Sequence, residues 1–221
     1  KISAIVAMMI VIYSGIAYAV MELQLMPAFR SLESDAIKSD YNRATNALSR
    51  DIDRIAMISG DWAPWDDTYR FVQGKNDQYI DANLDADTFD TLDLDVALFL
   101  DGSNRVVWGI LSGEILTTDK IPAELGLSSS SATRLLHHAS ERSQNDGIVN
   151  TRQGPMIISA RPIVTNTFAG PIAGTVIFGY FLTDERLGEL RRRTEVDLDL
   201  LDLAGSEEKY SAGSKRAVCW S

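Results

Sequence analysis

An apolar segment at the start of the chain dominates its hydrophobic pattern. No charged side chain occurs from Ile2 to Met21, and most of these positions hold Ile, Val, Ala, Met or Tyr. About twenty residues, with a rise of about 1.5 Å each, cover the roughly 30 Å hydrocarbon thickness of a bilayer. The segment is therefore predicted to be an uncleaved transmembrane helix or signal anchor, which would make the membrane one partner of this chain.

The same residues leave two alternatives for this segment. Ala17-Tyr18-Ala19 fits a small-x-small cleavage site, but the apolar run is longer than the usual signal-peptide core of about 7 to 15 residues. A buried core helix is the other alternative, and the length of the run disfavours it.

A long amphipathic pattern follows. Apolar residues recur at separations of three, four and five over residues 29–58, with charged residues between them, as one face of a helix requires. Leu48, Ile52 and Ile55 approach a short heptad seam. The pattern predicts a long helix that ends near residues 59–60 and packs on its own domain. Pairing with the same helix of a second copy, in a homodimer, is a further prediction.

Polar and acidic stretches separate this helix from the rest of the chain. Pro64 disfavours a continuous helix, and Asp66 and Asp67 are suited to cap a short second helix that runs to Val72. Residues 74–93 are rich in Asp and are predicted to form a loop. A calcium loop is the alternative there, but the EF-hand spacing of acidic residues, Gly and a distant Glu is missing.

Beyond this acidic stretch the period becomes that of strands. Alternating residues on either side of a turn at Asp101-Gly102 predict a hairpin, and Ser, Thr and Gly-Pro steps mark the ends of further elements. The expected strands cover residues 96–100, 106–109, 147–151, 156–164, 174–181 and 196–203, and the expected helices cover 132–136 and 184–193. Short strands after one long helix, without βαβ alternation, predict an α+β fold in which an antiparallel sheet has flanking helices to one side.

The charge balance and the cysteine count limit the classes of partner that this chain can bind. The formal net charge is -10, with 31 Asp and Glu against 21 Lys and Arg. Binding to nucleic acid needs clustered cations, so this balance argues against a nucleic-acid partner and against anionic lipid surfaces. Cys219 is the only cysteine, which excludes an intrachain disulfide and a multi-cysteine metal site. We expect no cofactor and no metal.

Catalytic motifs are weak throughout the sequence. His137 and His138 are adjacent, so they do not form the i, i+4 pair of a zinc helix. Neither a Gly-x-Ser-x-Gly motif nor a phosphate-binding loop occurs. Asp66 and Asp67 are neighbouring carboxylates, but consecutive side chains rarely face one site. The sequence therefore disfavours an enzyme in this region.

The most specific motif lies directly after the long helix. It reads Asp61-Trp62-Ala63-x-Trp65-Asp66-Asp67-x-Tyr69-x-Phe71-Val72, and Tyr79-Ile80 and Asn83-Leu84 follow. Later segments are Ser159-Ala160-Arg161-Pro162-Ile163, Gly170-Pro171-x-x-Gly174-Thr175 and Gly179-Tyr180. Together with the preceding span and long helix, these motifs resemble the CHASE4 family of extracytoplasmic sensor domains over most of residues 29–203.

The resemblance implies a PAS-like or Cache-like sensor domain held between two membrane spans of a bacterial or archaeal receptor. The receptor would lie in the inner membrane with the sensor on its extracytoplasmic side. Its output would be a histidine kinase, a diguanylate cyclase or a cyclic-di-GMP phosphodiesterase. The expected organisation is a membrane helix with its flank over 1–26, the sensor over 27–203, and a tail over 204–221 that is flexible or continues. A membrane-anchored structural or interaction domain without a small-molecule ligand is the alternative function.

The resemblance also implies a set of ligand-facing residues. They are Trp62, Trp65, Asp66, Tyr69 and Arg161 first, and Asp61, Asp67, Asn83 and Tyr180 second. Arg161 has a physical argument of its own, because a guanidinium within a largely apolar strand must be satisfied by a ligand anion or by a carboxylate of the protein. An internal salt bridge from Arg161 to Asp66 or Asp61 is the alternative. Aromatic rings with an arginine are compatible with amines, amino acids, carboxylates and purines, so the ligand class stays open.

Overall fold

The computed structural model describes residues 2–84, 86–125, 129–196 and 219–220. The chain divides into two compact units, residues 1–45 and residues 46–221. The helix α2 (Met26–Trp62) crosses the boundary between them.

The first unit is helical. It contains α1 (Ile2–Val20), a π-helical turn η1 (Met21–Leu25) and the beginning of α2. Within the described residues, one segment, Ile5–Leu23, is long and apolar enough to cross a membrane. None of its window is buried by other parts of the protein, as expected of side chains that would face lipid.

In the second unit, α2 continues beyond its predicted end. The prediction that it stops near residues 59–60 is wrong, because Ser59 is fully buried and its hydroxyl group bonds inside the fold. Ser59 Oγ donates to the Ile55 carbonyl at 3.0 Å and lies 2.5 Å from Ser159 Oγ on the sheet. The helix ends at Trp62, two residues before Pro64, and Pro64 disfavours helical geometry at the residue preceding it.

Three short helices follow. The predicted second helix is confirmed as α3 (Asp66–Phe71), but the prediction that Asp66 and Asp67 cap it is wrong: its N-cap residue is Trp65, and the two aspartates lie in its first turn. The prediction of a loop over 74–93 is partly wrong, because α4 (Tyr79–Asn83) and α5 (Ala86–Thr91) form there. Each helix is anchored by an aromatic residue, Tyr79 or Phe89, that is 1% exposed. Tertiary burial thus stabilises helices that are too short to show a periodic pattern.

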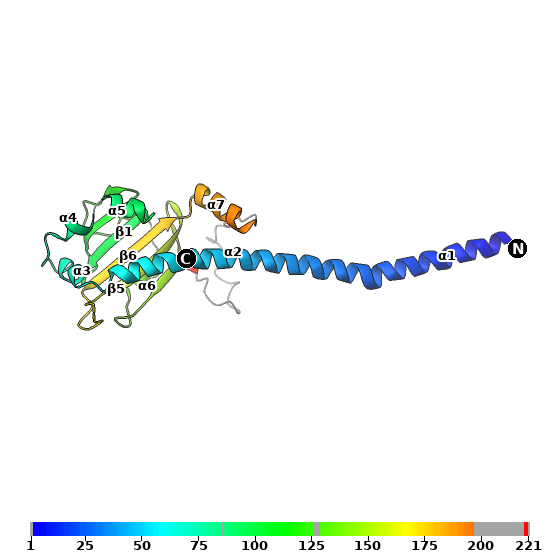
Figure 1. The fold of residues 1–221 in the computed structure, drawn as a ribbon, viewed down its shortest axis with the longest axis horizontal. Helices are drawn as coiled ribbons and strands as arrows, with labels where there is room; N and C mark the ends of the chain where they lie inside the picture. Colours follow the sequence, from blue (N-terminus) through cyan, green and yellow to red (C-terminus); the bar gives the residue numbers. More distant parts are fainter. Residues whose placement is uncertain (1, 85, 126–128, 197–218, 221) are drawn as a thin grey trace. The chain divides into compact units, whose positions relative to one another are not determined.

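The sheet confirms the predicted α+β class (Figure 1). Its strand order is β3-β2-β1-β6-β5-β4-β7, with antiparallel pairing throughout except that β7 runs parallel to β4. The strands are β1 (Val96–Asp101), β2 (Val106–Leu111), β3 (Glu114–Ile115), β4 (Asn145–Thr151), β5 (Gly154–Ile163), β6 (Gly174–Phe181) and β7 (Cys219–Trp220). The predicted hairpin and the three later strands are confirmed. Residues 197–203 of the last predicted strand, and all of the predicted tail except β7, lie outside the described residues.

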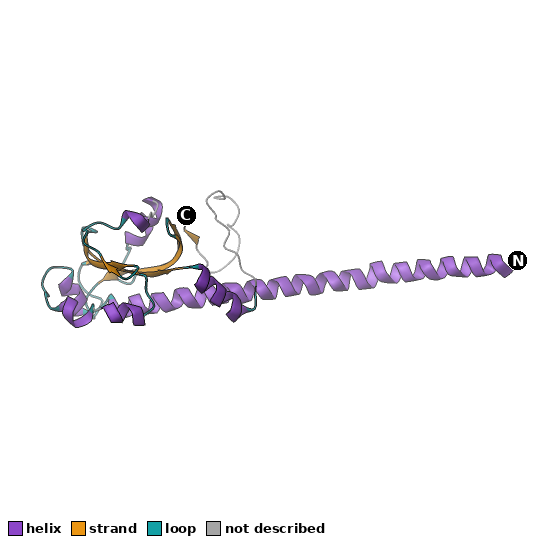
Figure 2. Cartoon of the chain, turned by 90° about the horizontal axis from the view of Figure 1, so that it is seen from above, coloured by secondary structure: helices purple, strands orange, loops and turns teal. Residues whose placement is uncertain are grey.

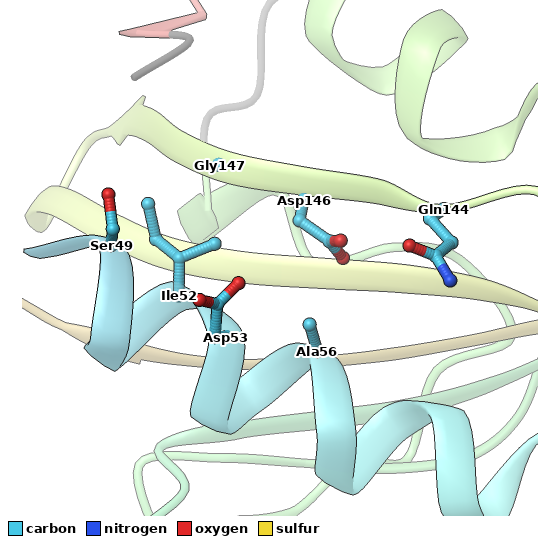
Figure 3. A pocket seen from close by; sticks show the side chains of 7 residues that line it. All are labelled: Ser49, Ile52, Asp53, Ala56, Gln144, Asp146 and Gly147. Atoms are coloured by element: carbon cyan, nitrogen blue, oxygen red, sulfur yellow. The ribbon is translucent and has the colours of Figure 1, made fainter. Parts of the chain in front are cut away.

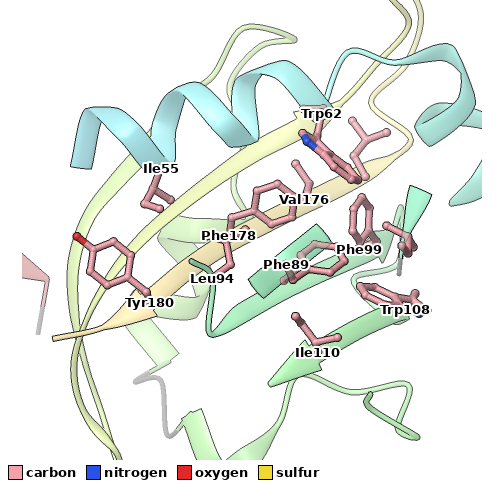
Figure 4. Close-up of a cluster of buried hydrophobic side chains, with 14 of the residues drawn as sticks. Ile55, Trp62, Phe89, Leu94, Phe99, Trp108, Ile110, Val176, Phe178 and Tyr180 are labelled. Atoms are coloured by element: carbon pink, nitrogen blue, oxygen red, sulfur yellow. The ribbon is translucent and has the colours of Figure 1, made fainter. Parts of the chain in front are cut away.

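The prediction that the helices lie to one side of the sheet is wrong, because both faces are apolar and helices cover both of them (Figure 2). On one face, Phe99, Trp108 and Phe178 pack against Ile55 of α2 and against α3 to α5, as Figure 4 shows in part. The other face is covered by the connection from β3 to β4, which contains the 3-10 turn η2 (Ala123–Leu125) and α6 (Ser129–Leu136). Since the central strands are buried on both faces, they read as continuous apolar runs.

The helix predicted over 184–193 is confirmed as α7 (Asp184–Thr194). Thr183 caps it, because its side chain accepts a hydrogen bond from the backbone N–H of Arg186 at 3.3 Å. Asp184 and Glu185 lie in its first turn and three arginines in its last, as the helix dipole favours.

Candidate functional site

The two tryptophans of the acidic and aromatic motif stack on each other. Their ring centroids are 5.2 Å apart with an interplanar angle of 15°. Trp62 is 8% exposed and also contacts Phe89, Phe99 and Phe178, with ring centroids 5.8 to 6.2 Å away. Figure 4 shows Trp62 pointing from the end of α2 toward this group. Its indole is therefore part of the core, and Trp65 covers it at the start of α3.

The polar residues of the motif bond within the protein. Asp66 accepts a hydrogen bond from the backbone N–H of Asn166 at 3.0 Å, which ties α3 to the loop after β5. Asp67 pairs with Arg70 at 2.5 Å on the same helix. Asn83 donates to the Tyr79 carbonyl at 3.2 Å.

Two further residues of the motif differ in exposure. Tyr69 is half-buried and its hydroxyl lies beside Gly170, whereas Asp61 is exposed on α2. We call this region the aromatic junction. It consists of the end of α2, the whole of α3 and the residues that contact them.

Arg161 lies elsewhere on the sheet and forms a buried ion pair. It is 6% exposed, and its two terminal nitrogens donate to the carboxylate of Asp146 at 2.5 and 2.9 Å. The alternative of a salt bridge to Asp66 or Asp61 is wrong. Asp146 on β4 is in register with Ser159 on β5, so Arg161 is its diagonal neighbour on the same face of the sheet, within reach of a long side chain.

The same guanidinium also contacts α2. One terminal nitrogen donates to the Ala56 carbonyl at 3.4 Å, and the other donates to the Ala160 carbonyl at 3.2 Å. Gly60, one turn further along α2, lies beside the guanidinium group: a Cβ there would lie 3.9 Å from Nε, an ordinary van der Waals contact. Arg161 therefore links α2, β5 and β4.

A pocket of about 360 Å³ opens beside this ion pair, between α2 and β4 (Figure 3). Asp53 reaches into it from α2, and Asp146 reaches into it from β4. Its lining residues are Ser49, Ile52, Asp53, Ala56, Gln144, Asp146 and Gly147. None of the predicted ligand-facing residues lines it, although Arg161 bonds to its wall.

The charges that this pocket presents to solvent are negative. Asp53 is exposed and the side chain of Asp146 is 20% exposed, whereas the side chain of Arg161 is 7% exposed and lies behind Asp146. Sequence reasoning missed Asp53 and Asp146. For Asp146 the available signal was a carboxylate at the start of a strand, whereas Asp53 has the appearance of an ordinary exposed position of a helix.

Tyr180 lies in a third place. It is 4% exposed, and its ring lies between the guanidinium groups of Arg54 and Arg186, at 5.2 and 4.7 Å from the ring centroid. Burial, together with the charge of Asp51, raises the pKa of its hydroxyl to about 12. The predicted site residues thus belong to the aromatic junction, to the Arg161 ion pair and to the surroundings of Tyr180.

The two adjacent histidines lie in different surroundings. His138 Nε2 lies 2.9 Å from the Thr175 hydroxyl on the sheet, whereas His137 is exposed. Burial, the neighbouring His137 and Arg161 lower the pKa of His138 to about 4. Across residues 2–84, 86–125, 129–196 and 219–220, no cluster of three or more His, Cys, Asp or Glu is placed to hold a metal ion.

The lowered pKa of His138 predicts a pH effect on stability. An unfolded histidine takes up a proton near pH 6.5, whereas folded His138 does so only near pH 4. The folded state therefore loses stability as the pH falls from 6.5 to 4, by an amount on the order of 2 kcal/mol. Urea unfolding between pH 7 and pH 4 should show a shallower loss for His138→Gln than for the wild type. His137→Gln is the matched control, and an equal change in both variants would contradict the assignment.

Comparison with known proteins identifies the domain family. The CHASE4 domain family matches residues 47–201. The chain is 29% identical over 211 residues to the methanogenesis regulatory histidine kinase FilI of Methanothrix harundinacea strain 6Ac, covering 95% of this chain and 24% of that protein. It therefore spans about a quarter of the relative's length. The sensor domain of the histidine kinase DctB from V. cholerae shares the fold, with a TM-score of 0.51 and 12% identity over 76% of this chain and 61% of that one.

Proposed function

Since this chain belongs to the CHASE4 domain family, we propose that its sensor domain is the extracytoplasmic, ligand-reading part of a membrane receptor. The apolar segment Ile5–Leu23 supports membrane anchoring by its length and composition. The similarity to a regulatory histidine kinase supports a kinase output in preference to cyclic-di-GMP turnover. The periplasmic placement and the homodimer expected from the sequence are parts of this proposal.

The pocket between α2 and β4 is the proposed ligand site. The single observation that carries this choice is that the pocket wall includes Asp146, whose carboxylate is bonded to Arg161. Arg161 in turn donates to the Ala56 carbonyl of α2. A ligand in this pocket would thus contact α2 directly and also affect the residue that joins α2 to the sheet.

A change in the position of α2 is the proposed response. A ligand that bonds to Asp146 competes with Arg161 for the same carboxylate and weakens one of the connections between the sheet and α2. Binding then shifts the population toward the α2 position that the ligand prefers, by no more than its difference in affinity for the two positions. Since α2 begins at Met26, directly after η1, this movement would be passed toward the apolar segment.

The charge of the pocket favours a cationic ligand. Asp53 and Asp146 attract a protonated amine, and Ile52 and Ala56 offer apolar contact to its carbon chain. An anion would meet two carboxylates, and Arg161 is already paired and buried. Among the ligand classes that the sequence left open, amines therefore match this pocket better than carboxylates.

The aromatic junction has a different proposed role. We propose that Trp62, Trp65, Asp66 and Tyr69 hold the end of α2 against the sheet, and that Asp61, Asp67, Asn83 and Tyr180 support neighbouring elements. Among the residues that the sequence predicts to face the ligand, Arg161 would then be the one that responds to it, through its bond to Asp146. Because Trp62 packs against three aromatic rings, a purely structural role without a small-molecule ligand is favoured for this junction, but not for the rest of the domain.

Binding of two matched C4 compounds tests the ligand class. Putrescine, a diamine, is expected to raise the Tm of the full chain in detergent micelles by several degrees, and succinate at equal ionic strength is not. Asp53→Asn should remove the putrescine shift, because it removes one of the two carboxylates that line the pocket. Asp61→Asn is the matched control, since it makes the same change on the exposed surface of the same helix and should keep the shift.

Other outcomes identify other sites. A shift that survives Asp53→Asn but disappears in Trp65→Ala would move the ligand to the aromatic junction. A shift with succinate alone would overturn the cationic class. No shift with either compound would favour the structural alternative.

A further inference from the structure

The helix α7 is attached to the sheet largely through charged side chains. Arg186, in its first turn, donates to the carboxylate of Asp93 at 2.6 Å and to that of Asp95. The same guanidinium donates to the Phe181 carbonyl at 3.0 Å, and Asp95 accepts from the backbone N–H of Phe181 at 2.7 Å. The side chains of Arg186 and Asp95 are 22% and 26% exposed, so water screens this connection only in part.

Helix α2 takes part in the same network. Arg54 of α2 donates to the Leu92 carbonyl at 3.1 Å and pairs with Asp93 at 3.4 Å. Asp93 therefore receives arginines from both helices. It does so from a left-handed backbone conformation, with φ at 55°, which is uncommon for residues other than glycine, although aspartate adopts it more readily than most.

A second ion pair joins the two helices one to two turns away. Arg193, near the end of α7, donates to Asp51 of α2 at 2.8 Å. The hydrogen bond to Asp51 raises the pKa of Arg193 above its ordinary value. Asp51 is 18% exposed, so one member of the pair is sheltered from water.

The apolar contacts of α7 are few by comparison. Its buried residues are Leu187, Leu190 and Thr194, which form a narrow stripe. A pocket of about 250 Å³ lies next to this stripe, with residues of both α2 and α7 in its wall. The space between the two helices is therefore incompletely filled, and α7 has room to change position.

We propose that these ion pairs form a clamp that makes α7 a releasable helix whose attachment depends on the position of α2. The clamp consists of Asp51, Arg54, Asp93, Asp95, Arg186 and Arg193 around Tyr180. While it is closed, α7 stays on the sheet. A displacement of α2 separates Asp51 from Arg193, so α7 loses one of its two ion-paired attachments. It also pulls Arg54 away from Asp93, the carboxylate that Arg186 of α7 shares. The helix before the sheet and the helix after it are then coupled through side chains, whatever ligand starts the movement.

Hydrogen exchange of the full chain in detergent micelles tests the clamp. In Arg186→Gln and in Asp51→Asn, backbone amides of α7 are expected to exchange about tenfold faster than in the wild type. Amides in the middle of β6, from Val176 to Phe178, should exchange at unchanged rates, because these residues pair with β1 and β5 and lie away from the contacts of Phe181 with the clamp. Arg192→Gln makes the same change of charge on an exposed position of α7 and is the matched control.

Exchanging the two charges of the Asp51–Arg193 pair tests whether the protection of α7 can be restored. Asp51→Arg alone should loosen α7, and the double variant Asp51→Arg with Arg193→Asp should restore its protection. Unchanged protection of α7 in Arg186→Gln would overturn the clamp. Faster exchange in the middle of β6, in parallel with α7, would also overturn it, because the contacts would then stabilise the whole domain. Loosening by Arg186→Gln but not by Asp51→Asn would overturn the coupling to α2.

Discussion

Replacing Trp62 with alanine is expected to lower the free energy of unfolding by about 4 kcal/mol. The substitution removes a side chain that is 8% exposed and leaves a cavity next to Phe89, Phe99 and Phe178. It also removes the surface on which Trp65 stacks. Urea unfolding monitored by far-UV circular dichroism measures the loss.

Trp65→Ala is the matched control for this prediction. Trp65 is half-buried, so its removal should cost clearly less, about 1 to 2 kcal/mol. A loss at Trp62 of less than 1 kcal/mol would mean that its indole does not belong to the core. In that case the role in ligand binding implied by the family resemblance would regain its physical support.

The second large effect is expected at the buried ion pair. Arg161→Ala should destabilise the fold by about 3 kcal/mol, because it leaves the carboxylate of Asp146 largely shielded from water without its partner. Arg161→Lys should recover only part of this loss, since an ammonium group cannot reproduce the two parallel bonds to Asp146. Chemical denaturation of each variant gives the comparison.

An exposed arginine pair in the same sheet provides the control. Arg105 pairs with Asp101 at 2.7 Å, but its side chain is 67% exposed, so Arg105→Ala should cost at most about 1 kcal/mol. The double variant Arg161→Met with Asp146→Leu should be more stable than either single variant, because it leaves no unpaired charge in the interior. Equal losses in Arg161→Ala and Arg105→Ala would show that burial of the first pair does not matter.

The candidate site illustrates which parts of a function can be found in a sequence. Arg161 stands out because a guanidinium in an apolar strand needs a partner, and the structure provides one. The partner could not be named in advance, because Asp146 lies on the neighbouring strand and meets Arg161 only through the register of β4 and β5. Asp53 looks like an ordinary polar position of a helix until β4 is placed across from it.

The role of the aromatic motif, unlike the need of Arg161 for a partner, could not be read from the sequence. Its composition is the same for a ligand pocket and for a packed junction, since tryptophan serves both. Only the positions of Phe89, Phe99 and Phe178, which come from three separate elements, place the indole of Trp62 in the core. The short helices α4 and α5 were missed for a related reason, because burial of Tyr79 and Phe89 stabilises them rather than local propensity.

The sequence by itself determined the features that depend on neighbouring residues. These are the apolar segment, the long helix α2 apart from its end, the strands β1, β2, β4, β5 and β6, the capped helix α7 and the motif of the CHASE4 family. Periodicity, capping and turn chemistry act over a few residues, so they can be read along the chain. The tertiary structure alone decided which charges meet: Arg161 with Asp146, and the arginines of α2 and α7 with Asp93. Those pairings depend on strand register and helix packing, which bring together residues that lie far apart in the sequence.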